Sequence, residues 1–299
     1  MNVETPDGRT LRIWFAGVEG GAPILVHHGT PSSGLLYGPW VEDAIARDAC
    51  LIGYDRAGYG GSDRRAGRTV ADVVVDVRAI AGALRIDRLV TWGISGGGPH
   101  ALACAALAPD LVAAAACLAG PARFDAEGLD WLAGMGEANL VEFGAAVAGE
   151  RVLRPLLDEA GAGIVAGGVT GLRQALETLL SPVDAEMLAA GLADFLAEST
   201  EAALRETVDG WVDDDLAFVK PWGFELASIR VPVLLFQGAQ DRFVPVSHFE
   251  WLSAHVPAAD TRLAPDHGHL SLYGGGVTEV HDWLLGRRED PVVARRTRG

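Results

Sequence analysis

One serine stands within a run of glycines, in the segment Gly93-Ile94-Ser95-Gly96-Gly97. A serine hydroxyl becomes a nucleophile when a nearby base removes its proton, and that base needs an acid to orient it. The pattern Gly-x-Ser-x-Gly between a strand and a helix is typical of a sharp turn that exposes the serine oxygen. Glycines next to the serine have no Cβ, so such a turn can close without a clash. Ser95 is therefore the candidate nucleophile.

A candidate acid and two candidate bases lie downstream. Asp241 follows an apolar run that ends at residue 238, so we expect it at the carboxyl end of a strand, where open α/β sheets place their sites. His267 and His269 come next, and on the residues alone the choice between them is nearly even. We favour His269, which stands between a glycine and a leucine, as general base. His267 is then a loop residue or a substrate contact, and Asp125 is the reserve acid.

Two backbone N–H groups are candidates for stabilising the negative charge that develops on a reacting carbonyl oxygen. The N–H of Gly96 begins the helix after the serine, and helix N-termini carry free donors and a positive dipole end. The N–H of Thr30 lies in the segment His28-Gly29-Thr30-Pro31, directly after the apolar run 24–26. Each such donor contributes about 2.7–4 kcal/mol to transition-state stabilisation. We therefore expect Thr30 and Gly96 to form an oxyanion hole.

The elements that must position these groups alternate between strand and helix. Apolar runs predict strands, and helical spacing predicts helices between them. This alternation favours βαβ units and an α/β fold, with a mostly parallel central sheet flanked by helices. The predicted strands are 11–15, 23–27, 50–54, 88–92, 111–118, 231–238 and 261–263, and the predicted helices are 39–47, 70–84, 96–107, 245–254 and 277–285.

The middle of the chain breaks this rhythm. No convincing strand occurs between residues 125 and 220, and helical patterns at 172–180 and 184–196 are punctuated by glycines. We therefore expect a helical cap insertion, residues 125–224, in a single core domain formed by residues 1–124 and 225–299. The tail from residue 287 to 299 mixes charges of both signs, and we expect it to fray.

Two features of the cap bear on a substrate pocket. Four of its aromatic side chains are either core residues or pocket walls: Trp131, Phe195, Trp211 and Phe218. The run Asp213-Asp214-Asp215 is interpreted as a solvated turn, although such a cluster near a pocket would disfavour anionic substrates.

Composition narrows the possible partners. The formal net charge of −16 over 299 residues argues against binding to nucleic acid or to an anionic membrane, since both require a basic surface. The three cysteines have no spacing typical of a disulfide framework or a zinc site. The first residues show neither a basic nor an apolar signal-peptide region. We expect a cytoplasmic protein that acts on a small molecule and needs no metal or cofactor; its oligomeric state stays open.

Together these motifs resemble the α/β-hydrolase family over residues 10–120 and 228–286. The resemblance includes His28 to Pro31, residues 54–62, the turn at Ser95, residues 238–241 and the pair Gly268-His269. It implies that Ser95 is the nucleophile, Asp241 the acid and His269 the base, and that residues 54–62 form a structural turn near the site. The epoxide hydrolase and dehalogenase branches carry an aspartate where Ser95 stands, so the resemblance favours the serine-nucleophile branch.

The expected function is that of a serine hydrolase that cleaves an ester-type bond through an acyl-enzyme intermediate. Esterases, proline-iminopeptidase-like enzymes and cofactor-free haloperoxidases are hard to separate on these motifs. One alternative is therefore an aminopeptidase of the proline-iminopeptidase type, in which a cap acid would bind the free amine of the substrate; Glu137, Glu142 and Asp213 are candidates. A second alternative is a non-catalytic ligand-binding module on the same fold, against which the presence of all three triad residues argues.

Overall fold

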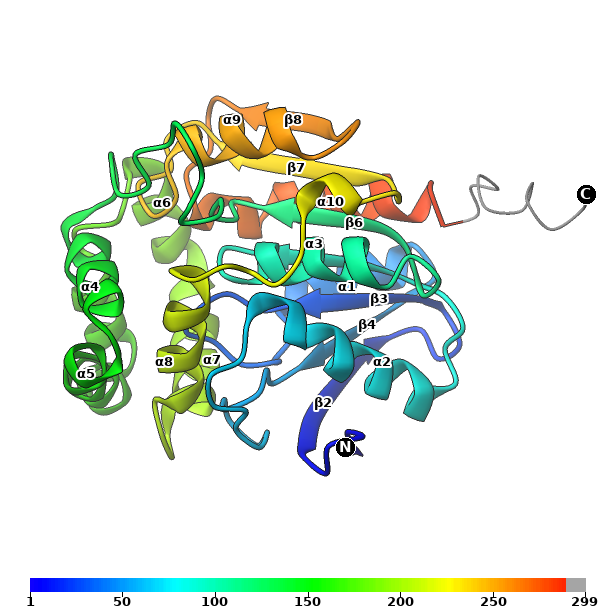
Figure 1. Cartoon of the computed structure of the whole chain (residues 1–299), viewed down its shortest axis with the longest axis horizontal. Coiled ribbons are helices and arrows are strands. Elements are labelled where there is room, and N and C mark those ends of the chain that lie inside the picture. The colour runs from blue at the N-terminus through cyan, green and yellow to red at the C-terminus, as the bar shows by residue number, and fades with distance from the viewer. Residues whose placement is uncertain (289–299) are drawn as a thin grey trace, which may run out of the picture.

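The computed structural model describes residues 1–288. The expectation for the tail beyond residue 288, and that part of the predicted core domain, lie outside the described residues. An eight-stranded sheet forms the centre, in the order β1-β2-β4-β3-β5-β6-β7-β8 (Figure 1). β1 and β2 are antiparallel to their neighbours and all other pairs are parallel. The expected mostly parallel α/β sheet is confirmed.

The strand bounds follow the apolar runs. They are β1 Asn2–Glu4, β2 Thr10–Gly17, β3 Ala22–His27, β4 Ala49–Tyr54, β5 Leu89–Ile94, β6 Val112–Leu118, β7 Val233–Gly238 and β8 Asp260–Ala264. Every residue of β5, β6 and β7 is buried, because helices cover both faces of a parallel sheet. β1 is a short edge strand that the sequence pattern did not predict.

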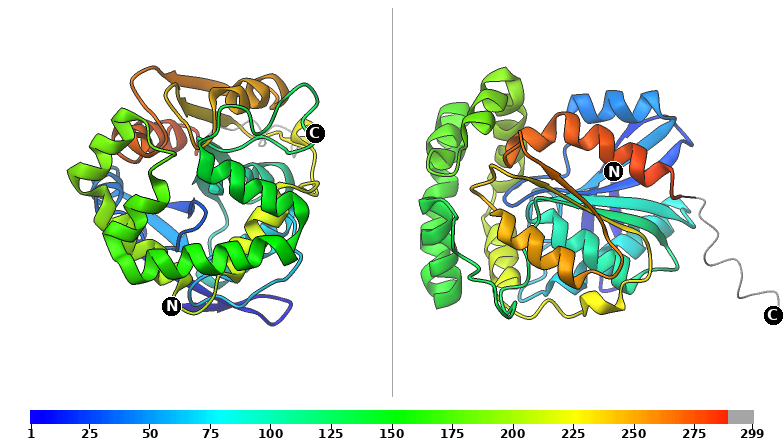
Figure 2. Two further views of the ribbon diagram at one scale, coloured as in Figure 1. Left: turned by 90° about the vertical axis from the view of Figure 1, so that its left-hand side faces the viewer. Right: turned by 90° about the horizontal axis from the view of Figure 1, so that it is seen from above.

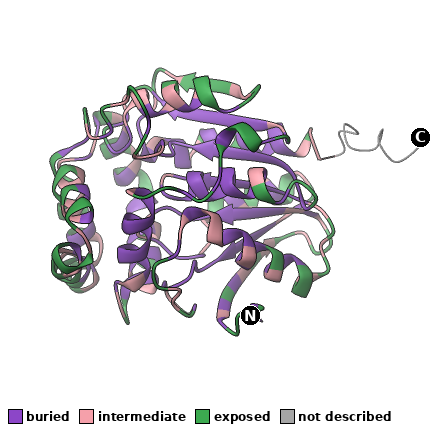
Figure 3. Ribbon diagram, viewed as in Figure 1, coloured by how far each residue is buried: buried purple, intermediate pink, exposed green. Residues whose placement is uncertain are grey.

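Five helices cover the two faces of the sheet. They are α1 Gly38–Ala46, α2 Val73–Leu84, α3 Gly97–Leu107, α9 Val246–His255 and α10 Gly275–Leu285. Seen from above, α1 and α10 lie on one face, and α3 and α9 lie on the other (Figure 2, right). Buried residues concentrate in this sandwich (Figure 3). These helices agree with the predicted ones to within a few residues.

The chain between β6 and β7 is helical and stands across the carboxyl ends of the strands (Figure 1). We refer to residues 125–224 as the cap. Its helices are α4 Glu137–Ala148, α5 Glu150–Leu176, α6 Pro182–Met187, α7 Ala193–Leu204 and α8 Asp209–Phe218. α7 and α8 form an inner layer next to the sheet, and α4 and α5 form an outer layer (Figures 1 and 2).

The predicted cap helices had wrong bounds. The pattern at 172–180 is the end of α5, which begins at Glu150 and stops at Leu176. Within α5, Gly168 has φ 53° and ψ −132°, a conformation that favours glycine and interrupts the helix. The pattern at 184–196 is divided between α6 and α7 by a π-helical turn at Leu188–Leu192.

Candidate active site

The turn from β5 into α3 carries Ser95. Its φ is +54°, in the left-handed region that residues other than glycine rarely adopt. Its N–H donates to Leu118 O over 2.8 Å, and its carbonyl accepts from Gly98 N–H, also over 2.8 Å. A Cβ on Gly97 would overlap the backbone oxygens of residues 27 and 28, so α3 begins in direct contact with the loop after β3. The sequence context predicted this turn correctly.

The carboxylate of Asp241 holds the ring of His269. Asp241 Oδ2 lies 2.7 Å from His269 Nδ1 and also accepts from the side-chain amide of Gln237 over 2.9 Å. The other oxygen, Oδ1, accepts the backbone N–H groups of Phe243 (2.8 Å) and Val244 (2.9 Å). Both members of the pair are buried. Because four hydrogen bonds fix the carboxylate, Asp241 holds the imidazole in one orientation.

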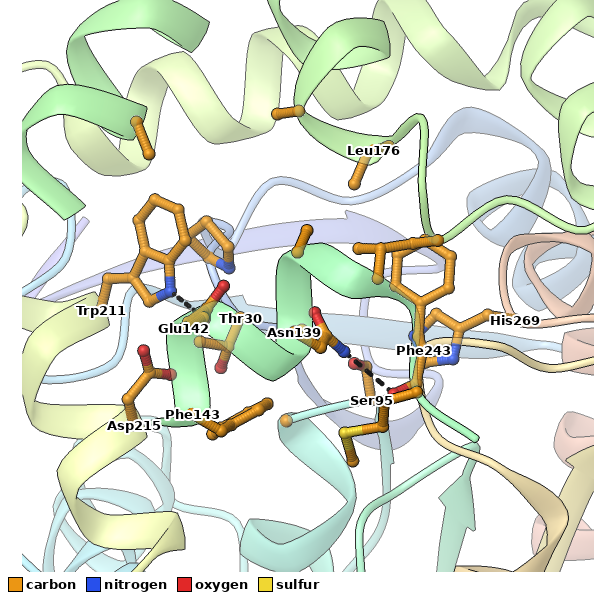
Figure 4. Close-up of a pocket in the computed structure, with 18 of the residues that line it drawn as sticks. Thr30, Ser95, Asn139, Glu142, Phe143, Leu176, Trp211, Asp215, Phe243 and His269 are labelled. Carbon is orange, nitrogen blue, oxygen red and sulfur yellow. Dashed lines mark hydrogen bonds between the residues drawn. The ribbon is translucent and has the colours of Figure 1, made fainter. Parts of the chain in front are cut away.

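This pairing changes the proton affinity of His269. Burial alone would lower the pKa of the ring, but the charge and the hydrogen bond of Asp241 outweigh it, so the pKa is raised above its ordinary value of 6.5. The ring also stacks on Phe243, with centroids 4.4 Å apart. Ser95 and His269 line the same cavity, and they lie close together beside Phe243 (Figure 4).

The cap also supports the loop that carries His269. Asp184, in α6, accepts the N–H of His269 over 3.0 Å and the N–H of Ser271 over 2.9 Å. The sequence suggested no role for Asp184. Its only signal is the pattern Ser181-Pro182-Val183-Asp184, which marks a helix start and gives no indication of a partner 85 residues away.

The two residues that carry the candidate oxyanion donors lie next to each other at the cavity. Thr30 and Gly96 both line it together with Ser95. A Cβ on Gly96 would collide with the Thr30 side chain, so the two residues are in close proximity. Both N–H groups are without an acceptor in the part of the chain that the structure describes.

The cavity lies between the carboxyl edge of the sheet and the cap, and its volume is about 480 Å³. That size suits a small organic molecule. Its walls are mainly apolar, with side chains from both layers of the cap such as Met135, Phe143, Leu157, Leu172, Leu176, Leu196 and Phe218. Of the four aromatic residues considered from the sequence, Trp131, Trp211 and Phe218 line it, whereas Phe195 packs on Tyr37, with ring centroids 4.9 Å apart.

The reserve candidates lie outside the cavity. His267 is half-buried and is not among the residues that line it. Asp125 is exposed and pairs with Arg123 over 2.9 Å.

Of the three cap acids considered as amine-binding residues, Glu137 and Glu142 line the cavity and Asp213 does not.

The interpretation of Asp213 to Asp215 as a solvated turn is wrong. All three are buried in α8, and each has a different environment. Asp213 pairs with Arg64 over 2.8 Å, whereas Asp214 pairs with Arg56 over 2.6 Å. Asp215 faces the cavity. The counter-charges of Asp213 and Asp214 come from the loop after β4, and they compensate for the burial of these two carboxylates.

Asp215 and Glu142 form what we call the acid pair. Within the described chain, neither oxygen of Asp215 has an N–H or O–H donor, while Glu142 Oε1 accepts from Trp211 Nε1 over 2.8 Å. Burial and the adjacent Glu142 carboxyl raise the pKa of Asp215 well above 3.8, and burial raises that of Glu142. The nearby Glu142 carboxyl thus opposes the ionisation of Asp215 in addition to burial. In Figure 4 the acid pair and Trp211 lie at one end of the cavity, and Ser95 and His269 lie at the other.

Comparison with known proteins agrees with this architecture. Residues 22–144 match the family model described as alpha/beta hydrolase fold. A dihydrolipoyllysine-residue acetyltransferase component of the acetoin cleaving system of Pseudomonas putida is 27% identical over 271 residues, or 88% of this chain. The chain spans 62% of that relative's length.

Two other proteins match over almost their full lengths. The uncharacterized hydrolase YcgS of Bacillus subtilis is 23% identical over 289 residues, covering 94% of this chain and 96% of that protein. A thermophilic esterase from Thermogutta terrifontis has the same fold, with a TM-score of 0.69, 21% identity and coverage of 96% of this chain and 98% of that one.

The sheet order, the strand–serine–helix turn and the partial family match together define the fold of this protein. The chain has the α/β-hydrolase fold, and its residues 22–144 match the model of that family. Among residues 1–288, no group of three or more His, Cys, Asp or Glu side chains is arranged to hold a metal ion. Within the same residues, no helix combines the length and apolar character needed to cross a bilayer.

Proposed function

We propose that this protein is a serine hydrolase that cleaves carboxylic esters of small molecules through an acyl-enzyme intermediate on Ser95. The observation that carries the proposal is the meeting of three features at one cavity. These are a serine on a turn with positive φ, the His269–Asp241 pair at 2.7 Å, and the two unoccupied N–H groups of Thr30 and Gly96. The structural similarity to an esterase supports the same class of bond.

The proposed reaction follows from these positions. His269 takes the hydroxyl proton of Ser95 while the serine oxygen attacks the ester carbonyl, and the Thr30 and Gly96 N–H groups bind the resulting oxyanion. His269 then gives the proton to the leaving alcohol. Water, deprotonated by the same ring, releases the acid and restores Ser95. Asp241 stabilises the charged imidazolium that forms at each step.

The experiment combines labelling with a substrate panel. A serine-directed fluorophosphonate should label the wild-type protein at Ser95, and p-nitrophenyl esters of graded acyl length should be turned over. We expect Ser95→Ala to lose both properties without a change in thermal stability, whereas Ser253→Ala, which removes a hydroxyl on α9, should keep both. A folded Ser95→Ala variant with most of its esterase activity would refute the proposal. Absence of labelling and turnover in the wild type would favour the ligand-binding module.

The acid pair supports a second candidate, an aminopeptidase of the proline-iminopeptidase type. A free ammonium group at the far end of the cavity would give the unpartnered oxygens of Asp215 the donor they lack. Glu142 belongs to the set of cap acids considered from the sequence, while Asp215 replaces Asp213. Aminoacyl p-nitroanilides distinguish the two candidates. Faster hydrolysis of these amides than of simple esters, with the preference lost in Asp215→Asn, would favour the aminopeptidase.

A further inference from the structure

A buried arginine holds the loop that carries Thr30. Arg56 lies in the loop after β4, and its guanidinium donates to the carbonyl oxygens of His28 and Gly29, the latter over 3.1 Å. It also donates to Thr30 Oγ1 over 3.0 Å. The backbone N–H of Arg56 donates to His28 Nε2 over 3.1 Å, so Nδ1 of that ring bears the proton and donates to Gly29 O over 2.7 Å. Two donors thus hold the carbonyl of Gly29.

The geometry of the peptide bond links the position of the Gly29 carbonyl to the direction of the Thr30 N–H. The C=O of Gly29 and the N–H of Thr30 belong to one planar trans peptide, in which they point to opposite sides. With the carbonyl held on Arg56 and His28, the N–H points to the opposite side of the peptide, and Thr30 is one of the residues that line the cavity. A pre-oriented donor is what stabilisation of an oxyanion requires, because it needs no rearrangement during the reaction.

The cap holds Arg56 in turn. Asp214 of α8 lies 2.6 Å from the Arg56 guanidinium, and both side chains are almost fully buried. The same carboxylate accepts the hydroxyls of Thr30 (2.7 Å) and Tyr59 (2.8 Å) and pairs with Arg68 (2.6 Å). Although burial opposes its ionisation, the two arginines hold the pKa of Asp214 well below 3.8. Without the charge of Asp214, the buried guanidinium groups of Arg56 and Arg68 would lose the carboxylate that they share. Leaving such charges buried and unpaired is unfavourable, so the side chains would rearrange.

We propose that Arg56 and Asp214 are positioning residues that aim the Thr30 N–H at the oxyanion. The inference rests on the proposed function, because it assigns a support to the oxyanion hole of that reaction. It also gives the cap helix α8 a role in the chemical step, in addition to its role as a cavity wall.

The test compares two adjacent aspartates in α8. Asp214→Asn keeps the shape of the side chain and removes its charge, whereas Asp213→Asn does the same to the partner of Arg64 and serves as the matched control. Loss of one oxyanion donor lowers kcat by about 10²- to 10³-fold. A misdirected donor retains part of its effect, so we expect kcat of Asp214→Asn to fall by about 10- to 100-fold. KM should change little, and Asp213→Asn should match the wild type.

A second measurement separates positioning from general damage. Phenylboronic acid forms a tetrahedral anion with a reactive serine and so reports on the oxyanion hole, whereas the carboxylic acid product reports on the rest of the cavity. Asp214→Asn should weaken boronate binding by the same factor as kcat and leave product binding unchanged. If Asp214→Asn does not fold, Thr30→Val replaces it, because that change removes the hydroxyl held by Asp214 and Arg56 but keeps the N–H. It should shift boronate affinity in the same direction.

The outcomes distinguish this inference from the function on which it rests. A folded Asp214→Asn or Thr30→Val variant with wild-type kcat and wild-type boronate affinity would overturn the positioning role. Ser95→Ala would still be inactive in that case, so the proposed function would survive. An equal loss of boronate and product binding would also overturn it, because it indicates a collapsed cavity.

Discussion

Asp241 acts on His269 in two ways, through orientation and through charge. Replacement by asparagine keeps the shape of the side chain, removes the charge and allows the wrong tautomer of the ring, so we expect Asp241→Asn to lower kcat by about 10⁴-fold. The proton that leaves Ser95 needs a neutral ring, so wild-type activity should rise with pH through a pKa above 6.5. In Asp241→Asn that limb should move to lower pH.

The pH profile of kcat/KM between pH 5 and 9 measures both effects, with Asp125→Asn as a control on an exposed carboxylate. An acid limb that stays in place in Asp241→Asn would mean that another group controls the ionisation.

The two neighbouring histidines give a second prediction at this scale. His269 lines the cavity and pairs with Asp241, whereas His267 lies outside it. We expect His269→Ala to lose at least about 10³-fold in kcat, because the general base is removed, and His267→Ala to keep most of its activity. Ester turnover by the two variants, measured side by side, decides between them. A larger loss at His267 would reverse the assignment.

The sequence predicted the contacts of some aspartates and not those of others. The contact of Asp241 with His269 could be predicted, because a triad acid is expected directly after a strand and the strand has a clear apolar signal. Asp184, Asp214 and Asp215 could not, because their meaning depends on partners far away in the chain; Arg56 is 158 residues from Asp214. A run of acids without visible counter-charges is normally solvated.

At the scale of elements, the turn before α3 depends on close backbone contacts. A Cβ on Gly97 would overlap backbone oxygens that cannot move without shifting β3, so we expect Gly97→Ala to destabilise the protein by about 3 kcal/mol. Gly82 in α2 has nothing within 4 Å of its Cβ position, and Gly82→Ala should stabilise by about 0.5–1 kcal/mol. Urea denaturation of both variants measures the difference. Equal midpoints would contradict the tight packing of this turn.

Core strands were easier to predict than cap helices for a related reason. A strand buried on both faces is a continuous apolar run, which is visible without any knowledge of its neighbours. In α5 the glycines suggested interruption, yet the helix continues through several of them and breaks only at Gly168. Elsewhere in α5, Gly161 packs against Val208, so the absence of a side chain at this glycine allows a close contact within the cap. The division into core and cap at residues 125 and 224 stays a prediction.

At the scale of the whole molecule, buried histidines make stability depend on pH. Burial is the main cause that lowers the pKa of five of them: His27, His28, His100, His248 and His281. Below pH 6.5 the unfolded chain binds protons at these rings and the folded protein does not, so stability falls as pH falls. His269 acts in the opposite direction, because its pKa is raised.

The five rings with lowered pKa values therefore outweigh His269 in their effect on stability. Each ring changes the free energy of unfolding by at most about 1.4 kcal/mol per pH unit. We expect the melting temperature to drop steeply between pH 6.5 and 5, and His248→Gln to flatten the curve. A constant melting temperature over this range would contradict the neutral burial of these rings.

The position of α8 has a consequence for attempts to alter which molecules the cavity accepts. Consecutive side chains of this helix serve opposite sides: Asp214 binds the core and Asp215 faces the cavity. Any change that rotates or shifts the helix to reshape one contact also disturbs the other. Libraries aimed at new selectivity should therefore leave α8 intact and vary cavity-lining positions of α5 such as Leu157 and Leu172. α4 is less suitable, because its Asn139 donates to Phe243 O, and the Phe243 ring stacks on His269.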